Sequence, residues 1–82
     1  MTIKKPLAIK QPEVGRIMRD LRLAFGLTQE QFAAQLRVTY STINRWENGR
    51  SKPSPLAMEK IEGMLEKMGG EGQDLLAKYL PN

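Results

Sequence analysis

Cysteine and histidine are both absent from this chain of 82 residues. Their absence excludes disulfides, thiol nucleophiles, zinc fingers and most transition-metal sites. No glycine-rich phosphate loop or paired carboxylates replace them, so we expect no enzyme, no catalytic residues, no metal and no cofactor. No apolar run approaches the ~20 residues that span a bilayer. Proline and lysine also interrupt the N-terminus before any signal-like segment, so we expect a cytoplasmic protein.

The composition, 40% hydrophobic and 27% charged, is that of one small globular domain. The net charge of +4 is uneven, because residues 1–12 hold Lys4, Lys5 and Lys10 and no acid. A basic front of this kind favours an anionic polymer as partner. We divide the chain into a basic flexible arm (1–11), a central domain (12–68) and a short C-terminal helical segment (69–82). The arm is either a solvated tail or a contact to a DNA backbone.

Hydrophobic periodicity predicts an all-α fold, a compact bundle of four to five short helices. The first helix starts at Pro12, stops at Gly26 and has apolar residues at Val14, Ile17, Met18, Leu21 and Phe25. A second begins at a capping box formed by Thr28 and Gln31, and closes near Arg37. A fourth follows Ser54 and Pro55, and a last short helix is expected from Gly72 to Leu80.

The third helix, about residues 39–48, has two contrasting faces. Thr39 is suited to its N-cap, and Gly49 to the left-handed position that ends it. Ile43, Trp46 and Glu47 share the inner face. The outer face carries small hydrogen-bonding groups and one guanidinium rather than the Lys and Glu of an ordinary solvated face. Such groups bond to base edges and phosphates, which predicts a DNA-reading helix beside the alternative of a merely solvated face.

Two motifs carry a resemblance to a known family. Residues 27–33 (LTQEQFA) are followed by residues 43–50 (INRWENGR) and by Pro53. From about Val14 to Leu65, this chain resembles the Cro/repressor-type helix-turn-helix domain, the XRE family. The resemblance implies a lambda-repressor-like domain whose third helix enters the major groove of double-stranded DNA. One departure is Arg37, which stands where the family usually has glycine, so either Arg37 adopts a strained conformation or the turn differs.

The resemblance and the chemistry together assign roles to the polar residues. Arg45 is expected to read guanine, with a phosphate contact as the alternative, and Tyr40 to meet either a thymine methyl or a phosphate. The expected base-reading residues are Tyr40, Ser41, Arg45 and Asn44. The expected phosphate-binding residues are Gln29, Thr28, Thr39, Thr42, Asn48, Arg50 and Lys52. Arg50 and Lys52 have the alternative of being ordinary loop charges.

Glu47 shares a face with two large apolar side chains, so its carboxylate must be paired. The family pattern makes Arg22 the expected partner, and Trp46 is expected in the core. Apolar residues near the C-terminus predict a homodimer, with the alternative that they complete the core of a monomer. These residues are Met64, Met68, Leu75, Leu76, Tyr79 and Leu80.

The expected function is sequence-specific DNA binding by a small, repressor-like transcriptional regulator. Two alternatives remain. One is an antitoxin that represses its own operon and has a toxin partner. The other is a protein-interaction adaptor that uses the same fold.

Overall fold

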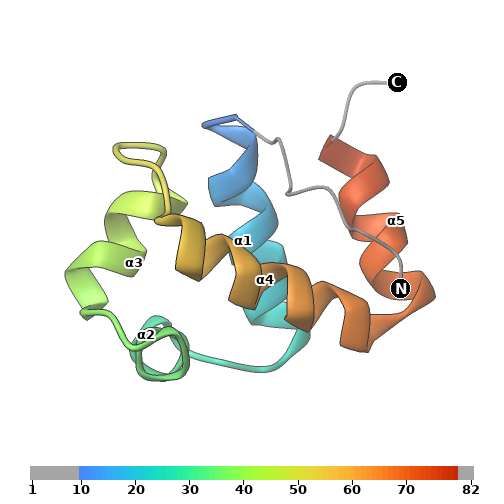
Figure 1. Cartoon of the computed structure of the whole chain (residues 1–82), viewed down its shortest axis with the longest axis horizontal. Helices are drawn as coiled ribbons and strands as arrows, with labels where there is room; N and C mark the ends of the chain where they lie inside the picture. Colours follow the sequence, from blue (N-terminus) through green and yellow to red (C-terminus); the bar gives the residue numbers. More distant parts are fainter. Residues whose placement is uncertain (1–9, 80–82) are drawn as a thin grey trace.

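The computed structural model describes residues 10–79, which form five α-helices in the order of Figure 1. The basic residues Lys4 and Lys5 of the expected arm, and Leu80 of the expected pairing surface, lie outside the described residues. Within the described part there is no strand, in agreement with the all-α prediction. The helices are α1 (Glu13–Ala24), α2 (Gln29–Leu36), α3 (Tyr40–Glu47), α4 (Pro55–Met68) and α5 (Gly70–Tyr79).

Helix α1 supplies the centre of the core. Its residues Ile17, Met18 and Leu21 are completely buried, and they pack with apolar residues of α2, α3 and α4. Gly15 lets α1 approach the end of α3, because a Cβ there would collide with the carbonyl oxygen of Trp46 and lie 2.9 Å from that of Glu47. The fixed distance between α1 and α3 therefore depends on a residue without a side chain.

Helices α2 and α3 form the helix-turn-helix. The predicted capping box is present, since Thr28 Oγ1 accepts a hydrogen bond from the Gln31 N–H (3.1 Å) and Gln31 Oε1 accepts one from the Thr28 N–H (2.9 Å). Arg37 occupies the left-handed region at φ 58° and ψ 44°. Thr39 caps α3 through the Thr42 N–H. Of the two expectations for this turn, the first holds, because Arg37 adopts the left-handed conformation that glycine would take.

The C-terminal helices pack back onto the domain. Ser54 caps α4 and Pro55 occupies its first turn, as predicted. Gly72 allows α5 to cross α4 closely, because a Cβ there would collide with the carbonyl oxygen of Leu65. Helix α5 lies beside α1 and α4 (Figure 1), and Tyr79 Oη donates a 2.6 Å hydrogen bond to Asp20 Oδ2 on α1.

The residues expected at a dimer surface take part in this monomer packing. Each is partly buried against the core of its own chain. This is the arrangement expected if these residues complete the core of a monomer. The described residues of this set are Met64, Met68, Leu75, Leu76 and Tyr79.

Three sequence-based expectations need correction. The spacing places Phe25 on the buried stripe of the first helix, but α1 ends at Ala24 and the Phe25 side chain is 40% exposed. The last helix begins at Gly70 rather than Gly72. The expected arm includes Gln11, but the Gln11 side chain is hydrogen-bonded to the folded domain.

Over residues 10–79, no helix has the length and apolar character needed to cross a membrane.

Candidate nucleic-acid interface

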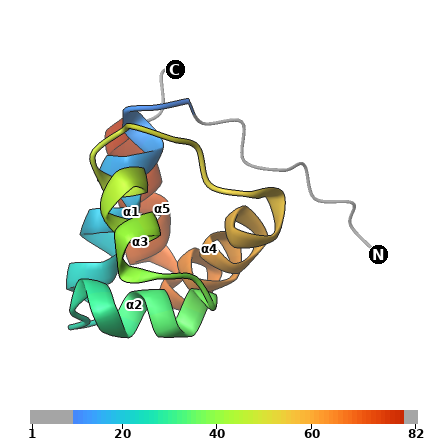
Figure 2. The ribbon, with the colours of Figure 1, turned by 90° about the vertical axis from the view of Figure 1, so that its left-hand side faces the viewer.

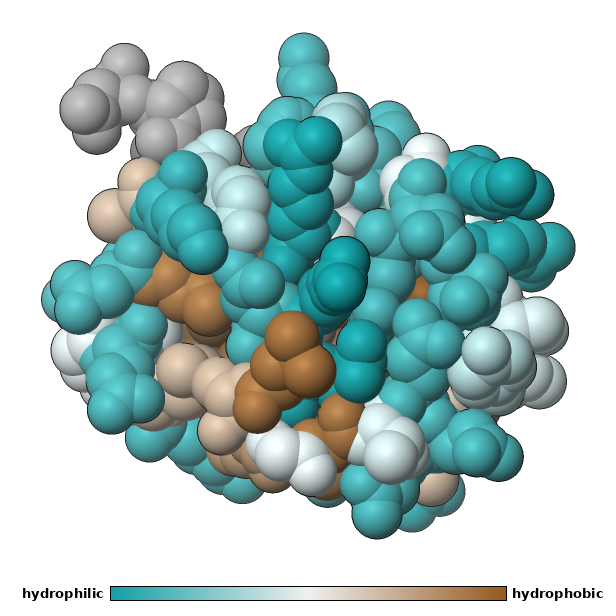
Figure 3. Space-filling model, turned by 180° about the vertical axis from the view of Figure 1, so that it is seen from behind, coloured by the Kyte–Doolittle hydropathy of each residue, from teal (hydrophilic) through white to brown (hydrophobic). Residues whose placement is uncertain are grey.

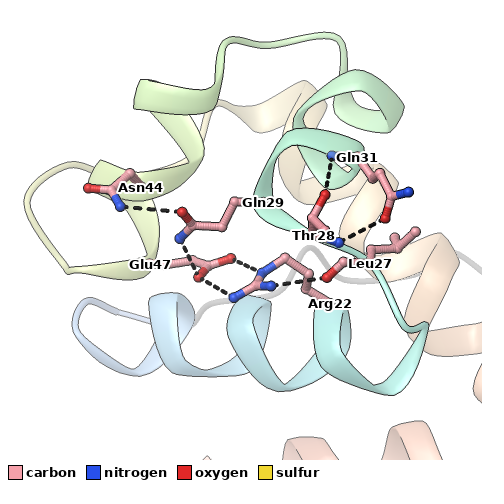
Figure 4. A network of polar contacts seen from close by, with 7 residues as sticks. All are labelled: Arg22, Leu27, Thr28, Gln29, Gln31, Asn44 and Glu47. Carbon is pink, nitrogen blue, oxygen red and sulfur yellow. Dashed lines mark hydrogen bonds and ion pairs between the residues drawn. The ribbon is translucent and has the colours of Figure 1, made fainter.

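A buried ion pair joins α1 to the end of α3. Arg22 Nε lies 2.8 Å from Glu47 Oε2, and Arg22 Nη2 donates a second hydrogen bond of 3.2 Å to Oε1 (Figure 4). The Glu47 side chain is only 4% exposed. Arg22 Nη1 also donates to the Leu27 carbonyl oxygen at 3.0 Å, between α1 and α2. One guanidinium therefore connects α1 to the end of α3 and to the loop that leads into α2.

A chain of side-chain amides continues from this pair along α3. Gln29 Nε2 donates to Glu47 Oε1 at 3.0 Å, and Asn44 Nδ2 donates to Gln29 Oε1 at 3.4 Å (Figure 4). Asn48 Nδ2 then donates to Asn44 Oδ1 at 3.1 Å. Gln29, expected at a phosphate, thus uses one amide N–H and its carbonyl oxygen inside the protein. Its second N–H remains available to an outside acceptor.

The outer face of α3 is open to solvent. Tyr40 is 52% exposed, Ser41 and Arg45 are also exposed, and Thr42 and Asn44 are half-buried. Figure 2 looks onto α3, with α2 crossing below it. Within residues 10–79, the Arg45 guanidinium forms no hydrogen bond or ion pair. The expected base-reading residues therefore share one helix of eight residues. Of these, Tyr40 and Arg45 are exposed to solvent.

The expected phosphate-binding residues flank this face. Thr28 lies at the start of α2, where its hydroxyl is used in the capping box. Thr39 lies at the start of α3, where its Oγ1 contacts the hydroxyls of Ser41 (3.1 Å) and Thr42 (2.8 Å). Asn48 is exposed at the other end of α3. Both ends of the helix therefore offer polar groups beside the exposed face.

Arg50 and Lys52 are exposed on the loop from α3 to α4. Neither forms an ion pair with any of residues 10–79. They lie beyond the C-terminal end of α3, at the opposite end from Thr39. Their charges are free to meet an anion next to the end of the helix.

Gln11, which the sequence placed in the flexible arm, supports the candidate site from behind. Its Nε2 donates to the carbonyl oxygens of Trp46 (3.0 Å) and Ser51 (2.6 Å), and its Oε1 accepts from the Gly15 N–H (3.0 Å). The side chain ties the start of α1 to the end of α3 and to the basic loop. A single glutamine in a lysine-rich segment gives no periodic signal from which this could be predicted.

Comparison with known proteins agrees with this geometry. The family model described as Helix-turn-helix (HTH_3) matches residues 18–67. A protein of Archaeoglobus fulgidus, named as an uncharacterized HTH-type transcriptional regulator, is 33% identical over 66 residues, which is 79% of this chain and 29% of that protein. This chain therefore spans less than a third of the length of that relative. No solved structure gives a significant match.

Proposed function

Because this chain belongs to the Cro/C1-type (XRE) helix-turn-helix family, we propose that it is a small, repressor-like transcriptional regulator that reads double-stranded DNA with α3. The observation that carries the proposal is the division of α3 into two faces. The inner face is committed to the fold through Ile43, Trp46 and Glu47. The outer face presents hydrogen-bonding groups to solvent. A helix of this diameter fits the major groove, where base edges offer matching donors and acceptors.

The proposed base contacts come from the exposed part of α3. Arg45 is the strongest candidate, because a free guanidinium fork matches the O6 and N7 acceptors of guanine. Tyr40 and Ser41 lie in the first turn of α3, which faces the bases in domains of this kind. Asn44 is held by Gln29 and Asn48, so we assign it a fixed orientation at the edge of the same face.

The proposed phosphate contacts lie around this helix. Arg50 and Lys52 supply charge beyond its C-terminal end, together with the amide of Asn48. Gln29 has one amide N–H left for a phosphate and stands where backbone N–H groups at the start of α2 are also free. The hydroxyls of Thr28, Thr39 and Thr42 have the rotational freedom to bond a phosphate in addition to their capping roles.

We also propose that two copies bind one site, in the cytoplasm. One α3 covers only a few base pairs, whereas two linked copies multiply their selectivity against the non-specific sites of a genome. Two-fold symmetry then requires a near-palindromic site with half-sites about 34–36 Å apart. Because the apolar residues of α4 and α5 already pack within one chain, the proposed pairing rests on this need for selectivity.

A protein-interaction adaptor would present a broad apolar anchor to its partner, whereas the outer face of α3 is mainly polar, which favours DNA as the partner. On the side of the molecule opposite to Figure 1, apolar side chains lie among polar ones and gather mainly over the lower half (Figure 3).

The experiment that tests the proposal compares two substitutions after selection of bound sites from random duplex DNA. Arg45→Ala should flatten discrimination at one or two positions of each half-site and leave non-specific binding intact. Lys52→Ala should weaken binding to all sequences alike and lower the slope of log affinity against log salt by about one. Fluorescence anisotropy on the selected and a scrambled duplex measures both effects. Identical behaviour of the two variants would refute the division into base-reading and phosphate-binding residues.

A further inference from the structure

Arg37 is the single non-glycine residue with positive φ among residues 10–79. The main chain alone closes its turn, since the Arg37 N–H donates to the Ala34 carbonyl oxygen (3.2 Å) and the Val38 N–H to that of Ala33 (2.9 Å). Glycine would form the same two bonds without the steric penalty that a Cβ incurs in this region. The turn itself therefore gives no reason for an arginine.

Apart from its positive charge at the C-terminal end of α2, where a cation is mildly favourable, the Arg37 side chain adds nothing to the described fold. It is exposed, and it makes no hydrogen bond or ion pair with any of residues 10–79. Strained residues that the local fold does not need are concentrated at functional sites. The function of Arg37 is therefore to be sought outside the folded domain.

The position of Arg37 is next to the proposed DNA-reading helix. It precedes the Thr39 cap of α3 by two residues, in the turn between α2 and α3 seen in Figure 2. Residues 31–46 contain Arg37 and Arg45 and no acidic residue, so this stretch of the chain carries positive charge only. A major groove about 12 Å wide holds one helix, and residues just outside the ends of that helix meet the flanking phosphates.

We infer that Arg37 is an additional DNA-backbone contact, at the end of α3 opposite to Arg50 and Lys52, and that its strained backbone is retained for this charge. The inference rests on the proposed function, because it requires α3 to lie in the groove. It predicts a specific conflict between stability and binding at one residue. Replacing Arg37 by glycine should make the domain more stable and its DNA binding weaker.

The test uses three variants of Arg37 and one matched control. Arg37→Gln removes the charge and keeps the strained backbone, Arg37→Lys keeps the charge, and Arg37→Gly removes both charge and strain. Lys67→Gln is the control, because it changes the net charge equally at an exposed position in the last turn of α4, away from α3 (Figure 1). The probe is a duplex of random sequence, titrated by fluorescence anisotropy between about 50 and 200 mM salt.

Arg37→Gln and Arg37→Gly should each lower the salt slope by about 0.9, which reduces the loss of affinity over this salt range by about 3.5-fold. Arg37→Lys and Lys67→Gln should keep the wild-type slope. Thermal unfolding followed by circular dichroism should give a higher midpoint for Arg37→Gly than for wild type, whereas Arg37→Gln should stay near wild type.

Two kinds of result overturn the inference. If wild type binds the duplex and Arg37→Gln has the same affinity and slope, Arg37 does not contact DNA, while the proposed function stands. Arg37 is also excluded as a contact if Lys67→Gln loses as much slope as Arg37→Gln, because the effect is then one of net charge. If wild type itself shows no salt-dependent binding to duplex DNA, the proposed function fails and the inference fails with it.

Discussion

Removing the Arg22 guanidinium should be the most damaging single change at the interface, although Arg22 touches no DNA in our proposal. Arg22→Ala eliminates two hydrogen bonds to Glu47 and one to the Leu27 carbonyl oxygen. It leaves behind a carboxylate whose side chain is 4% exposed. Breaking a buried ion pair from one side costs about 3–5 kcal/mol, because the remaining charge has lost its counter-charge.

The structure places the expected loss at the lower end of that range. Gln29 still donates to Glu47 Oε1 in the variant, so the carboxylate keeps one hydrogen bond. We therefore expect Arg22→Ala to lower the free energy of unfolding by about 3 kcal/mol. A domain of 82 residues has a total of roughly 4–12 kcal/mol. The thermal midpoint should fall by about 12–24 °C, at about 4–8 °C for each kcal/mol.

Urea denaturation followed by circular dichroism measures this loss, with Arg19→Ala as the matched control. Arg19 lies on the same helix, is exposed and has no ion pair within residues 10–79, so its removal should change stability by less than about 0.5 kcal/mol. The double variant Arg22→Met/Glu47→Leu removes both charges and should be more stable than Arg22→Ala. An Arg22→Ala protein as stable as wild type would refute the structural role of the pair. A double variant less stable than the single one would show that the buried charge is not the cause.

Two further predictions concern the helix contacts. Gly15→Ala should destabilise the domain by about 1–3 kcal/mol, because the added Cβ would collide with the end of α3. Gly63→Ala lies in α4 with nothing within 4 Å of the added Cβ, so it should stabilise the domain by about 0.5–1 kcal/mol. Equal effects of the two substitutions in urea denaturation would contradict the close approach of α1 and α3. The hydrogen bond to the Asp20 carboxylate, followed by burial and the charge of Asp20, raises the pKa of Tyr79 above 10.0. The unfolded protein therefore releases this proton first, so the stability that the bond adds is complete below about pH 10 and is lost as pH rises through the higher folded-state pKa. Tyr79→Phe should be less stable than wild type by on the order of 1 kcal/mol at about pH 7. Thermal denaturation at a series of pH values should show this difference shrinking above about pH 10. A difference that stays constant with pH would disprove the link between Tyr79 ionisation and stability.

Local chemistry predicted the beginnings of α2, α3 and α4 well. Thr28, Thr39 and Ser54 each cap the helix that their hydroxyl and position predicted. These signals depend on residues within one turn of each other, so the sequence contains them directly. Phe25 shows the limit of periodicity, because its spacing continues the apolar stripe past the point where the helix ends.

Contacts between distant residues were harder to predict. Gln11 bonds to residues 35 and 40 positions away, and nothing in its neighbours indicates this. The inward turn of the Gln29 amide depends on the position of Glu47, which only the packed helices fix. The Arg22–Glu47 pair could be predicted, because a charged residue on an apolar face requires a partner and the family pattern indicated an arginine at position 22. The sequence left two alternatives for the apolar residues of α5, a dimer surface or packing on the core of the same chain. An apolar stripe indicates that a residue is covered but not which surface covers it.

The short helix α3 explains how this scaffold can separate stability from recognition. Eight residues are too few for a helix that is stable alone, so α3 depends on tertiary contacts. Those contacts are made by the buried Ile43 and Trp46 and by the ion-paired Glu47. The side chains of the exposed Tyr40 and Arg45 form no hydrogen bond or ion pair with any of residues 10–79. Changes at these two residues should therefore alter binding while leaving the folded domain intact, since surface substitutions usually shift stability by less than about 0.5 kcal/mol.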